Sequence, residues 1–187
     1  MASSRNVAVL VGSLRKGSFT RRAAKALEAL APEGLRLTEV AIGALALYDE
    51  DLESSPPPAW MAFRDQVRPM DAVLFATPEY NRSVPGPLKN AVDVGSRPYG
   101  KSVWSGKPAA VVSVSPGAIG GFGANHHLRQ SLVFLDMPVL QQPEAYIGQA
   151  AQLFTEDGQV TSDGSREFLR KLMAAFAAWI EKTTAPR

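Results

Sequence analysis

The sequence predicts an α/β protein in which helices cover both faces of a five-stranded parallel sheet, a three-layer, doubly wound architecture. Two observations predict this class. Short apolar runs alternate along the chain with amphipathic stretches of helical spacing, as crossover helices between parallel strands require. Three of the runs, over residues 7–11, 72–76 and 109–114, are almost wholly apolar, which is typical of strands buried on both faces. The length of 187 residues suits one domain, which we expect to span residues 1–187.

The first half of the chain is expected to hold two strands and two helices. The β-branched run after Asn6 is a strand, and apolar residues from Phe19 to Leu30 then recur on one helical face until Pro32 and Gly34 end the helix. An alternating segment forms the second strand, and three consecutive prolines stiffen the end of the following loop. These patterns place a strand over 7–11, a helix over 19–30, a strand over 35–40, a loop over 41–58 and a short helix over 59–68.

The second half repeats the alternation. One apolar run precedes a loop rich in proline, glycine and asparagine, and another precedes a glycine-rich loop and a helix whose Leu128, Leu132 and Leu135 share one face. The last helix has the most regular apolar spacing. These patterns place strands over 72–76 and 109–114, loops over 77–87 and 116–123, helices over 88–95, around 128–135 and over 165–181, and candidates for the last strand at 139–140 and 145–147.

Composition excludes several classes of function. The chain has no cysteine, which excludes disulfides, thiolate metal sites, iron–sulfur clusters and thiol nucleophiles. A formal net charge of +2 is too small for a nucleic-acid-binding footprint, and no apolar run approaches the length of a membrane span. Residues 1–6 are polar and show no secretory signal. We therefore expect a cytoplasmic protein without nucleic-acid or membrane partners.

Three loops at the carboxyl ends of strands form the candidate binding site, because ligands of open α/β sheets bind there. The first loop, residues 12–18, carries Ser13, Arg15 and Ser18 in front of a helix. Hydroxyls, backbone N–H groups and a guanidinium at a helix N-terminus suit a phosphate dianion. The alternative is that Ser18 is a plain helix N-cap and Arg15 a solvated charge.

The second and third loops offer a rigid wall and room for close approach. Residues 77–87 contain three prolines, which hold their backbone groups in fixed positions and suit a planar, hydrogen-bonding heterocycle with Tyr80 as an apolar wall. The alternative is a rigid turn with solvated Glu79 and Arg82. Residues 113–121 are rich in glycine, which either lets a ligand approach the backbone closely or makes a tight turn before a helix.

Several familiar sites are rejected. Residues 12–17 have the glycine spacing of a Walker A loop, but the lysine that should follow is absent. The glycines near residue 121 lack the third glycine of a dinucleotide fingerprint. His126 and His127 are adjacent, so on a helix their side chains point in different directions, and we expect no metal. No Gly-x-Ser-x-Gly elbow of a serine hydrolase is present.

Several groups of residues recur in an order and at a spacing typical of one known family: Gly12–Phe19, Pro78–Asn81, Ser83–Gly86, Leu88–Asp93, Gly120–Gly121 and His127–Gln130. They resemble the NADPH-dependent FMN reductase family and, within it, the bacterial quinone and chromate reductases. The resemblance extends over residues 5–181. The resemblance implies a flavodoxin-like fold with strand order 2-1-3-4-5 and FMN bound without a covalent link.

The resemblance also assigns roles to individual positions of this chain. The residues implied around the FMN phosphate are Ser13, Arg15, Ser18, Phe19 and Thr20. Those implied along the isoalloxazine and ribityl are Pro78, Glu79, Tyr80, Asn81 and Arg82, with Ser115 and Gly117 completing the pocket. These positions fall in the three loops chosen above on physical grounds.

The implied activity is that of an NAD(P)H-dependent FMN reductase. NAD(P)H passes a hydride to N5 of FMN, the nicotinamide leaves, and a small acceptor takes the electrons in the same space, so that the chemistry is ping-pong and belongs to the cofactor. Implied acceptors are quinones, free flavins, azo compounds, ferric chelates and chromate. A homodimer is implied, with a homotetramer as a further assembly. The alternatives are a flavodoxin-type electron carrier without nicotinamide turnover and a module that binds another phosphorylated ligand.

Four positions depart from the family's pattern. Thr20 stands where the family usually has Asn, which affects the bracing of the phosphate loop. Val94 stands in place of Trp, which we expect to thin a wall near the flavin or the dimer contact. Gly123 and His126 replace an Arg and a Tyr that the quinone and chromate reductases carry nearby, at a contact between dimers.

Overall fold

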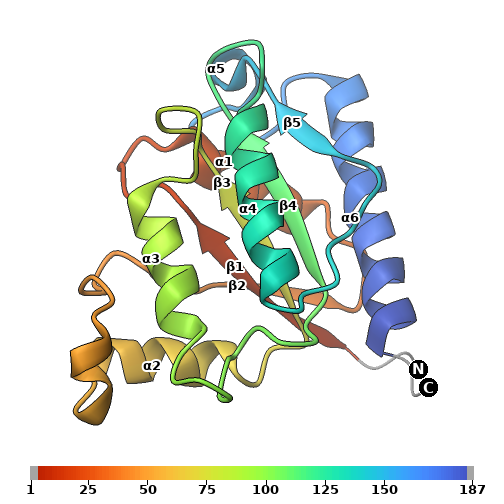
Figure 1. The fold of residues 1–187 in the computed structure, drawn as a ribbon. Helices are drawn as coiled ribbons and strands as arrows, with labels where there is room; N and C mark the ends of the chain where they lie inside the picture. Colours follow the sequence, from red (N-terminus) through yellow and green to blue (C-terminus); the bar gives the residue numbers. More distant parts are fainter. Residues whose placement is uncertain (1–3, 185–187) are drawn as a thin grey trace.

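The computed structural model describes residues 4–184, in which five parallel strands form one sheet in the order β2-β1-β3-β4-β5 (Figure 1). The strands are β1 (Arg5–Val11), β2 (Leu35–Glu39), β3 (Ala72–Thr77), β4 (Ala109–Val114) and β5 (Ala145–Ile147). This order is that of flavodoxin-like folds, which confirms the predicted fold class and the implied topology. The expected domain runs over 1–187, of which 1–3 and 185–187 lie outside the described residues.

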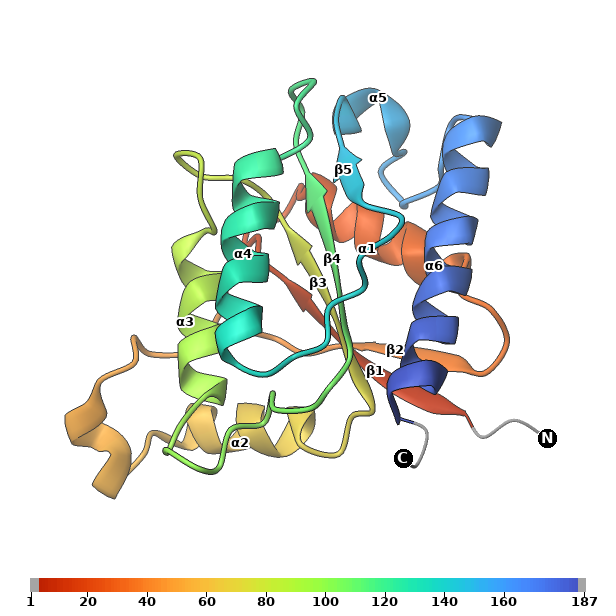
Figure 2. The ribbon, with the colours of Figure 1, turned by 45° about the vertical axis from the view of Figure 1, so that its right-hand side comes forward.

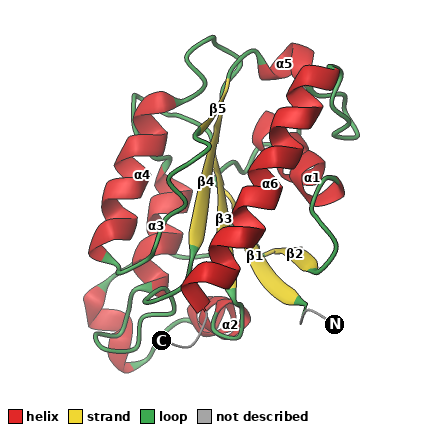
Figure 3. Ribbon diagram, turned by 90° about the vertical axis from the view of Figure 1, so that its right-hand side faces the viewer, coloured by secondary structure: helices red, strands yellow, loops and turns green. Residues whose placement is uncertain are grey.

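Helices cover both faces of the sheet, as the view along its edge shows (Figure 3). One face carries α1 (Phe19–Ala29) and α6 (Asp163–Thr184), and the other carries α2 (Pro58–Val67), α3 (Gly86–Gly95) and α4 (Phe122–Phe134). Each face has its own hydrophobic cluster. Val7, Val9 and Val11 of β1 belong to the first cluster, and Ala8 and Leu10 belong to the second. The continuous apolar run of this strand follows from that burial on both faces.

The central strands are buried throughout, and the edge strands are not. Every residue of β3 and β4 is buried, whereas β2 is largely exposed and β5 has only three residues. The alternating sequence pattern of β2 therefore reflects its position at the edge of the sheet. No helix within residues 4–184 is long and apolar enough to cross a membrane.

Three local elements differ from the sequence-based expectations. A 3₁₀ helix over Glu50–Ser54 lies inside the expected loop, and α5 (Ala150–Leu153) was not expected. Neither shows the apolar periodicity of a longer helix, and the 3₁₀ helix buries no residue. Of the two candidates for the last strand, only β5 forms; Val139 makes an isolated bridge to Ala109. Pro138, which lacks an N–H group, immediately precedes Val139 and prevents the bridge from extending in that direction.

The segment that contains the 3₁₀ helix (orange in Figure 2) projects beyond α3. It is anchored by Asn90, a buried residue of α3. Asn90 accepts a hydrogen bond from Tyr48 N at 2.8 Å and donates to Ala46 O at 3.0 Å. This clamp explains how a segment with little burial of its own is positioned. It also assigns a structural role to an asparagine within the motif that carried the family resemblance.

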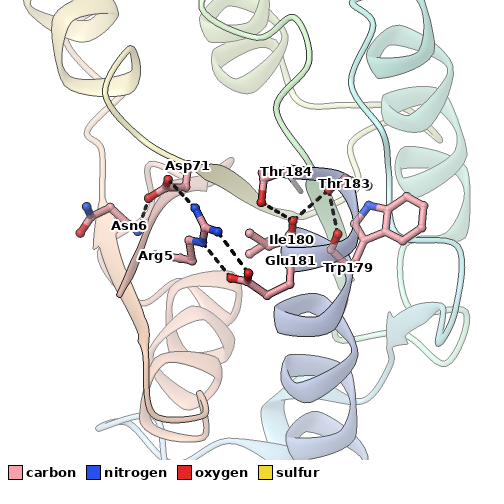
Figure 4. A network of polar contacts seen from close by, with 8 residues as sticks. All are labelled: Arg5, Asn6, Asp71, Trp179, Ile180, Glu181, Thr183 and Thr184. Carbon is pink, nitrogen blue, oxygen red and sulfur yellow. Dashed lines mark hydrogen bonds and ion pairs between the residues drawn. The ribbon is translucent and has the colours of Figure 1, made fainter. Parts of the chain in front are cut away.

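At the amino ends of the strands, the start of β1 is tied to the end of α6 (Figure 4). The Arg5 guanidinium donates two hydrogen bonds to the Glu181 carboxylate, at 2.8 and 3.1 Å, and lies 3.5 Å from Asp71 Oδ1. Asp71 in turn accepts a hydrogen bond from Asn6 N at 2.7 Å. These contacts join residues that are far apart in the sequence, and they lie away from the carboxyl ends of the strands.

Candidate active site

The loops that follow β1, β3 and β4 meet at the carboxyl edge of the sheet and enclose a cavity of about 880 Å³. These strands are neighbours, and the helices that follow the first two lie on opposite faces, with α1 on one and α3 on the other. The cavity thus lies at the topological switch point, where open α/β sheets bind their ligands. The predicted convergence of the three loops is confirmed.

Ten of the twelve predicted site residues line this cavity. They are Ser13, Arg15, Ser18, Phe19, Thr20, Pro78, Glu79, Tyr80, Asn81 and Ser115. The lining residues that the sequence analysis did not single out belong to the same loops or border them: Gly12, Leu14, Ser83, Val84, Pro85, Gly86, Pro87, Val114 and Pro116. Their position in those loops was the available signal, because a loop next to a ligand contributes several consecutive residues.

One end of the cavity is the N-terminus of α1. Ser18 caps this helix, since its hydroxyl oxygen accepts a hydrogen bond from Arg21 N at 3.1 Å. Thr20 is 2 % exposed and lines the cavity, and its hydroxyl makes no hydrogen bond within residues 4–184. The first N–H groups of a helix lack intrahelical acceptors and attract anions. Ser18 thus caps α1, and its O–H remains free to donate a hydrogen bond into the cavity, so capping and phosphate binding are compatible.

Arg15 adds a cation at this end. Its side chain forms no ion pair or hydrogen bond with any residue from 4 to 184, whereas nearby Arg21 is committed to Glu39 at 2.9 Å. An uncommitted guanidinium beside unpaired hydroxyl and N–H groups makes this end of the cavity suited to a phosphate.

A tight turn forms the opposite wall. Tyr80 and Ser83 exchange backbone hydrogen bonds of 3.0 and 2.8 Å, and Asn81 and Arg82 between them both have positive φ, at 48° and 63°. Two consecutive left-handed residues are the conformation of a type I′ turn. Neither is glycine, so the turn stores backbone strain and must be held by its surroundings.

The N-terminal part of α4 holds this turn. Glu79 accepts a hydrogen bond from Ala124 N at 3.1 Å and pairs with Arg82 at 3.6 Å. Gly123 permits the contact, because a Cβ atom there would lie 2.6 Å from the carbonyl oxygen of Arg82. Ser83 Oγ lies 2.9 Å from His127 Nδ1. A larger residue at 123 would require the turn to move.

Arg82 and Gly117 are the two predicted site residues that do not line the cavity. The Arg82 side chain is 73 % exposed at the tip of the turn. Gly117 lies behind the wall: its N–H donates to Ser115 Oγ at 3.1 Å, and its carbonyl oxygen accepts from Gln149 N. Gly120 packs against the backbone of Tyr146 instead of a ligand. Residues 117–120 of the third loop therefore form a tight turn, which was the alternative to close approach of a ligand.

The two histidines diverge, as predicted. His127 turns toward Ser83, whereas His126 Nε2 lies 2.9 Å from the Tyr146 hydroxyl. Burial and the neighbouring Glu144 raise the pKa of Tyr146 to about 12, so this phenol stays neutral. No cluster of three or more metal-binding side chains occurs in the described part of the chain. Val94 is buried in the core and lines neither this cavity nor the neighbouring one between α3 and α4.

Residues 5–152 match the sequence model of the family described as NADPH-dependent FMN reductase. The chain belongs to this family. It is 62 % identical over 186 residues to a quinone reductase of Pseudomonas putida, covering 99 % of this chain and 100 % of that protein. It is 45 % identical to a 2-hydroxy-1,4-benzoquinone reductase of a Burkholderia species, over 93 % of this chain and 95 % of that one. The solved structure of FerB, a flavoenzyme NAD(P)H:(acceptor) oxidoreductase from Paracoccus denitrificans, superposes with a TM-score of 0.90 at 43 % identity, covering 96 % and 98 % of the two chains.

Membership in the FMN reductase family confirms the predicted class, oxidoreductase, and the predicted cofactor pair of FMN and NAD(P)H. The cavity fits FMN on its own chemistry. Its α1 end offers the unpaired hydroxyl of Thr20 and the uncommitted Arg15 to a phosphate, and its other walls are rich in proline and carry Tyr80, which suits a planar ring system.

Proposed function

We propose that this FMN reductase passes electrons from NAD(P)H to quinones and related small acceptors, including free flavins, azo compounds, ferric chelates and chromate, by a ping-pong mechanism. One observation carries the proposal: the phosphate-binding end and the rigid turn belong to a single cavity. A flavin anchored at α1 leaves one open side, where nicotinamide and acceptor take turns. The bound FMN supplies the two-electron chemistry between them.

The first loop anchors the cofactor in this proposal. Arg15 and the hydroxyls of Ser13, Ser18 and Thr20 bind the phosphate together with the N–H groups of the first turn of α1. Phe19, over whose ring the Arg22 guanidinium lies at 5.2 Å, packs beside them. None of these groups needs to change its protonation state, so they bind and orient only.

The turn and the third loop position the ring system. Pro78, Glu79, Tyr80 and Asn81 form one wall and Ser115 the other, while Arg82 and Gly117 hold lining residues in place from outside the cavity. The N–H group of Asn81, which lines the cavity, makes no hydrogen bond within residues 4–184. Fixed backbone dipoles of this kind stabilise negative charge that develops on a bound ring during reduction.

We also propose that the protein is a homodimer. Tyr99, which follows α3, is 90 % exposed, and Phe134, which ends α4, is 89 % exposed. Large apolar side chains exposed to this degree at neighbouring helix ends suit a subunit interface. Sedimentation velocity should give a dimer for the purified protein and a shift toward monomer for Phe134→Glu; a wild-type monomer at micromolar concentration contradicts the proposal.

The catalytic proposal is tested by an absorbance spectrum of the purified protein, recorded without oxygen before and after addition of NADPH. Flavin bands that bleach with NADPH and return with a quinone support it. Flavin bands that persist indicate an electron carrier without nicotinamide turnover. A protein that stays colourless after incubation with FMN contradicts the proposal and favours another phosphorylated ligand.

A further inference from the structure

A hydrogen-bonded pair connects the active-site cavity with a second cavity. The second cavity, of about 650 Å³, lies between α3 and α4. Ser83 lines both cavities, and His127 lines only the second. Ser83 Oγ and His127 Nδ1 are 2.9 Å apart, and the imidazole is exposed. A hydroxyl in the reaction space is thus in direct contact with a titratable ring outside it.

A proton on Nδ1, which depends on the tautomer of the ring as well as on its charge, sets the direction of this hydrogen bond. If Nδ1 carries no proton, it accepts from the Ser83 hydroxyl, which then offers only lone pairs to the active-site cavity. If Nδ1 is protonated, it donates to Ser83 Oγ, and the Ser83 O–H becomes free to donate into that cavity. Imidazole is the side chain that changes protonation state near neutral pH, so the pair can store a proton for use in the cavity.

Quinone reduction needs such a proton. A quinone takes two electrons and two protons to become a hydroquinone. One proton arrives with the electron pair from the reduced cofactor, and the second must be added to the other quinone oxygen. Glu79 lies in the wall of the cavity, but its carboxylate accepts from Ala124 N and pairs with Arg82, so it is committed to the turn.

We infer that Ser83 and His127 supply the second proton to a quinone acceptor, an inference that rests on the proposed function. The Ser83 O–H bond breaks as its proton moves to the quinone oxygen, and Oγ takes the proton from His127 Nδ1, which leaves neutral imidazole. The exposed ring regains a proton from solvent. Ser83 is the catalytic residue, since it touches the acceptor, and His127 is a positioning residue that acts through Ser83.

Most charged groups near His127 are already paired with one another: Lys89 with Asp93 at 2.7 Å, and Glu79 with Arg82 at 3.6 Å. The titratable and charged groups that line the second cavity with His127 are Tyr48, Lys89, Asp93 and Arg97, and Glu79 and Arg82 belong to the turn that carries Ser83. Burial and the hydrogen bond to Glu53 raise the pKa of Tyr48 to about 12, so this phenol stays neutral.

The chain supplies a matched control, because it has only two histidines and they are adjacent. His126 bonds to Tyr146 and lines neither cavity. The test compares Ser83→Ala and His127→Asn, whose amide retains a hydrogen-bonding group near the Nδ1 position, with His126→Asn. All are prepared with FMN bound, and flavin content and thermal melting are measured first, so that a variant that fails to fold is recognised.

The first readout is the imidazole nitrogen NMR spectrum, in which the two histidine variants assign the two rings. Ser83→Ala should shift the Nδ1 signal of His127 and leave that of His126 unchanged. The second readout is reoxidation of the reduced protein by benzoquinone and by ferricyanide between about pH 5 and 8. Ferricyanide takes electrons without protons.

For Ser83→Ala and His127→Asn we expect benzoquinone reoxidation to slow on the order of 10²-fold, as loss of a general acid does, and to lose its pH dependence. Ferricyanide reoxidation and every rate of His126→Asn should stay at wild-type values. Equal losses with both acceptors indicate a purely structural pair and overturn the inference, as does an unchanged benzoquinone rate. If NADPH does not reduce the wild-type flavin, the proposed function fails, and chemical reduction still allows the reoxidation comparison.

Discussion

Replacement of Arg15 tests the assignment of the phosphate end of the cavity. In the structure its guanidinium is bound to no other residue from 4 to 184 and lines the cavity beside Ser13 and the N-terminus of α1. A charge-assisted hydrogen bond of this kind contributes about 1.5–3 kcal/mol. At about 1.4 kcal/mol per tenfold change, Arg15→Ala should raise the Kd for FMN about 10- to 150-fold. Because the side chain supports nothing else in the fold, thermal stability of the FMN-free protein should not change.

The assay is quenching of FMN fluorescence during titration of the FMN-free protein, at two salt concentrations. Lys16→Ala is the matched control, since it removes the same charge from the adjacent position, which does not line the active-site cavity. We expect Lys16→Ala to change the Kd less than threefold or so, by long-range electrostatics alone. Equal Kd values for Arg15→Ala and Lys16→Ala, or an Arg15→Ala protein that binds as wild type, would falsify the phosphate assignment.

Two further predictions concern the fold. Gly95→Ala should destabilise the protein by about 1–3 kcal/mol, because its Cβ would overlap the Trp104 ring, although helix propensity alone favours Ala by about 1 kcal/mol. Gly164→Ala in α6, where nothing lies within 4 Å of the added Cβ, should show only the favourable effect of helix propensity. The free energies of unfolding are measured by urea denaturation, and an increase for both variants refutes the packing argument. The hydrogen bonds from Arg5 hold the pKa of Glu181 below its usual value. The wild-type protein should therefore be more stable than Glu181→Gln, by an amount that is fully present above about pH 4.3 and disappears as the pH falls through the lowered pKa. Melting temperatures of both proteins against pH measure this difference, and a difference that grows toward acid contradicts it.

The main elements of the fold could be predicted because their patterns are local and unambiguous. A continuous apolar run such as residues 7–11 is stable only where both faces are covered, and the regular apolar spacing of 165–181 has one helical solution, realised in α6. The 3₁₀ helix over Glu50–Ser54 could not be predicted this way. It buries nothing, and the clamp from Asn90, more than 30 residues away, positions the segment in front of it.

The candidate site, too, could be predicted from the sequence only in part. Gly12–Ser18, with its hydroxyls and guanidinium before a helix, indicates an anion site from sequence alone, because the free N–H groups and the dipole of a helix N-terminus favour negative charge. The roles of individual residues in the second loop depend on α4. Glu79 has a carboxylate that faces Ala124 N, and Gly123 leaves room for the turn. Neither contact can be inferred from the spacing of the residues concerned.

The sequence by itself determined the fold class, the three loops that line the cavity and the family, because hydrophobic periodicity and loop chemistry are properties of short segments. Only the tertiary structure decided which residues of those loops face the cavity, that Arg82 points into solvent, and that Ser83 meets His127 across 44 positions of the chain. The physical reason is that the direction of a side chain depends on how α4 packs against the 79–83 turn, and this packing is set by contacts between segments that no local pattern encodes.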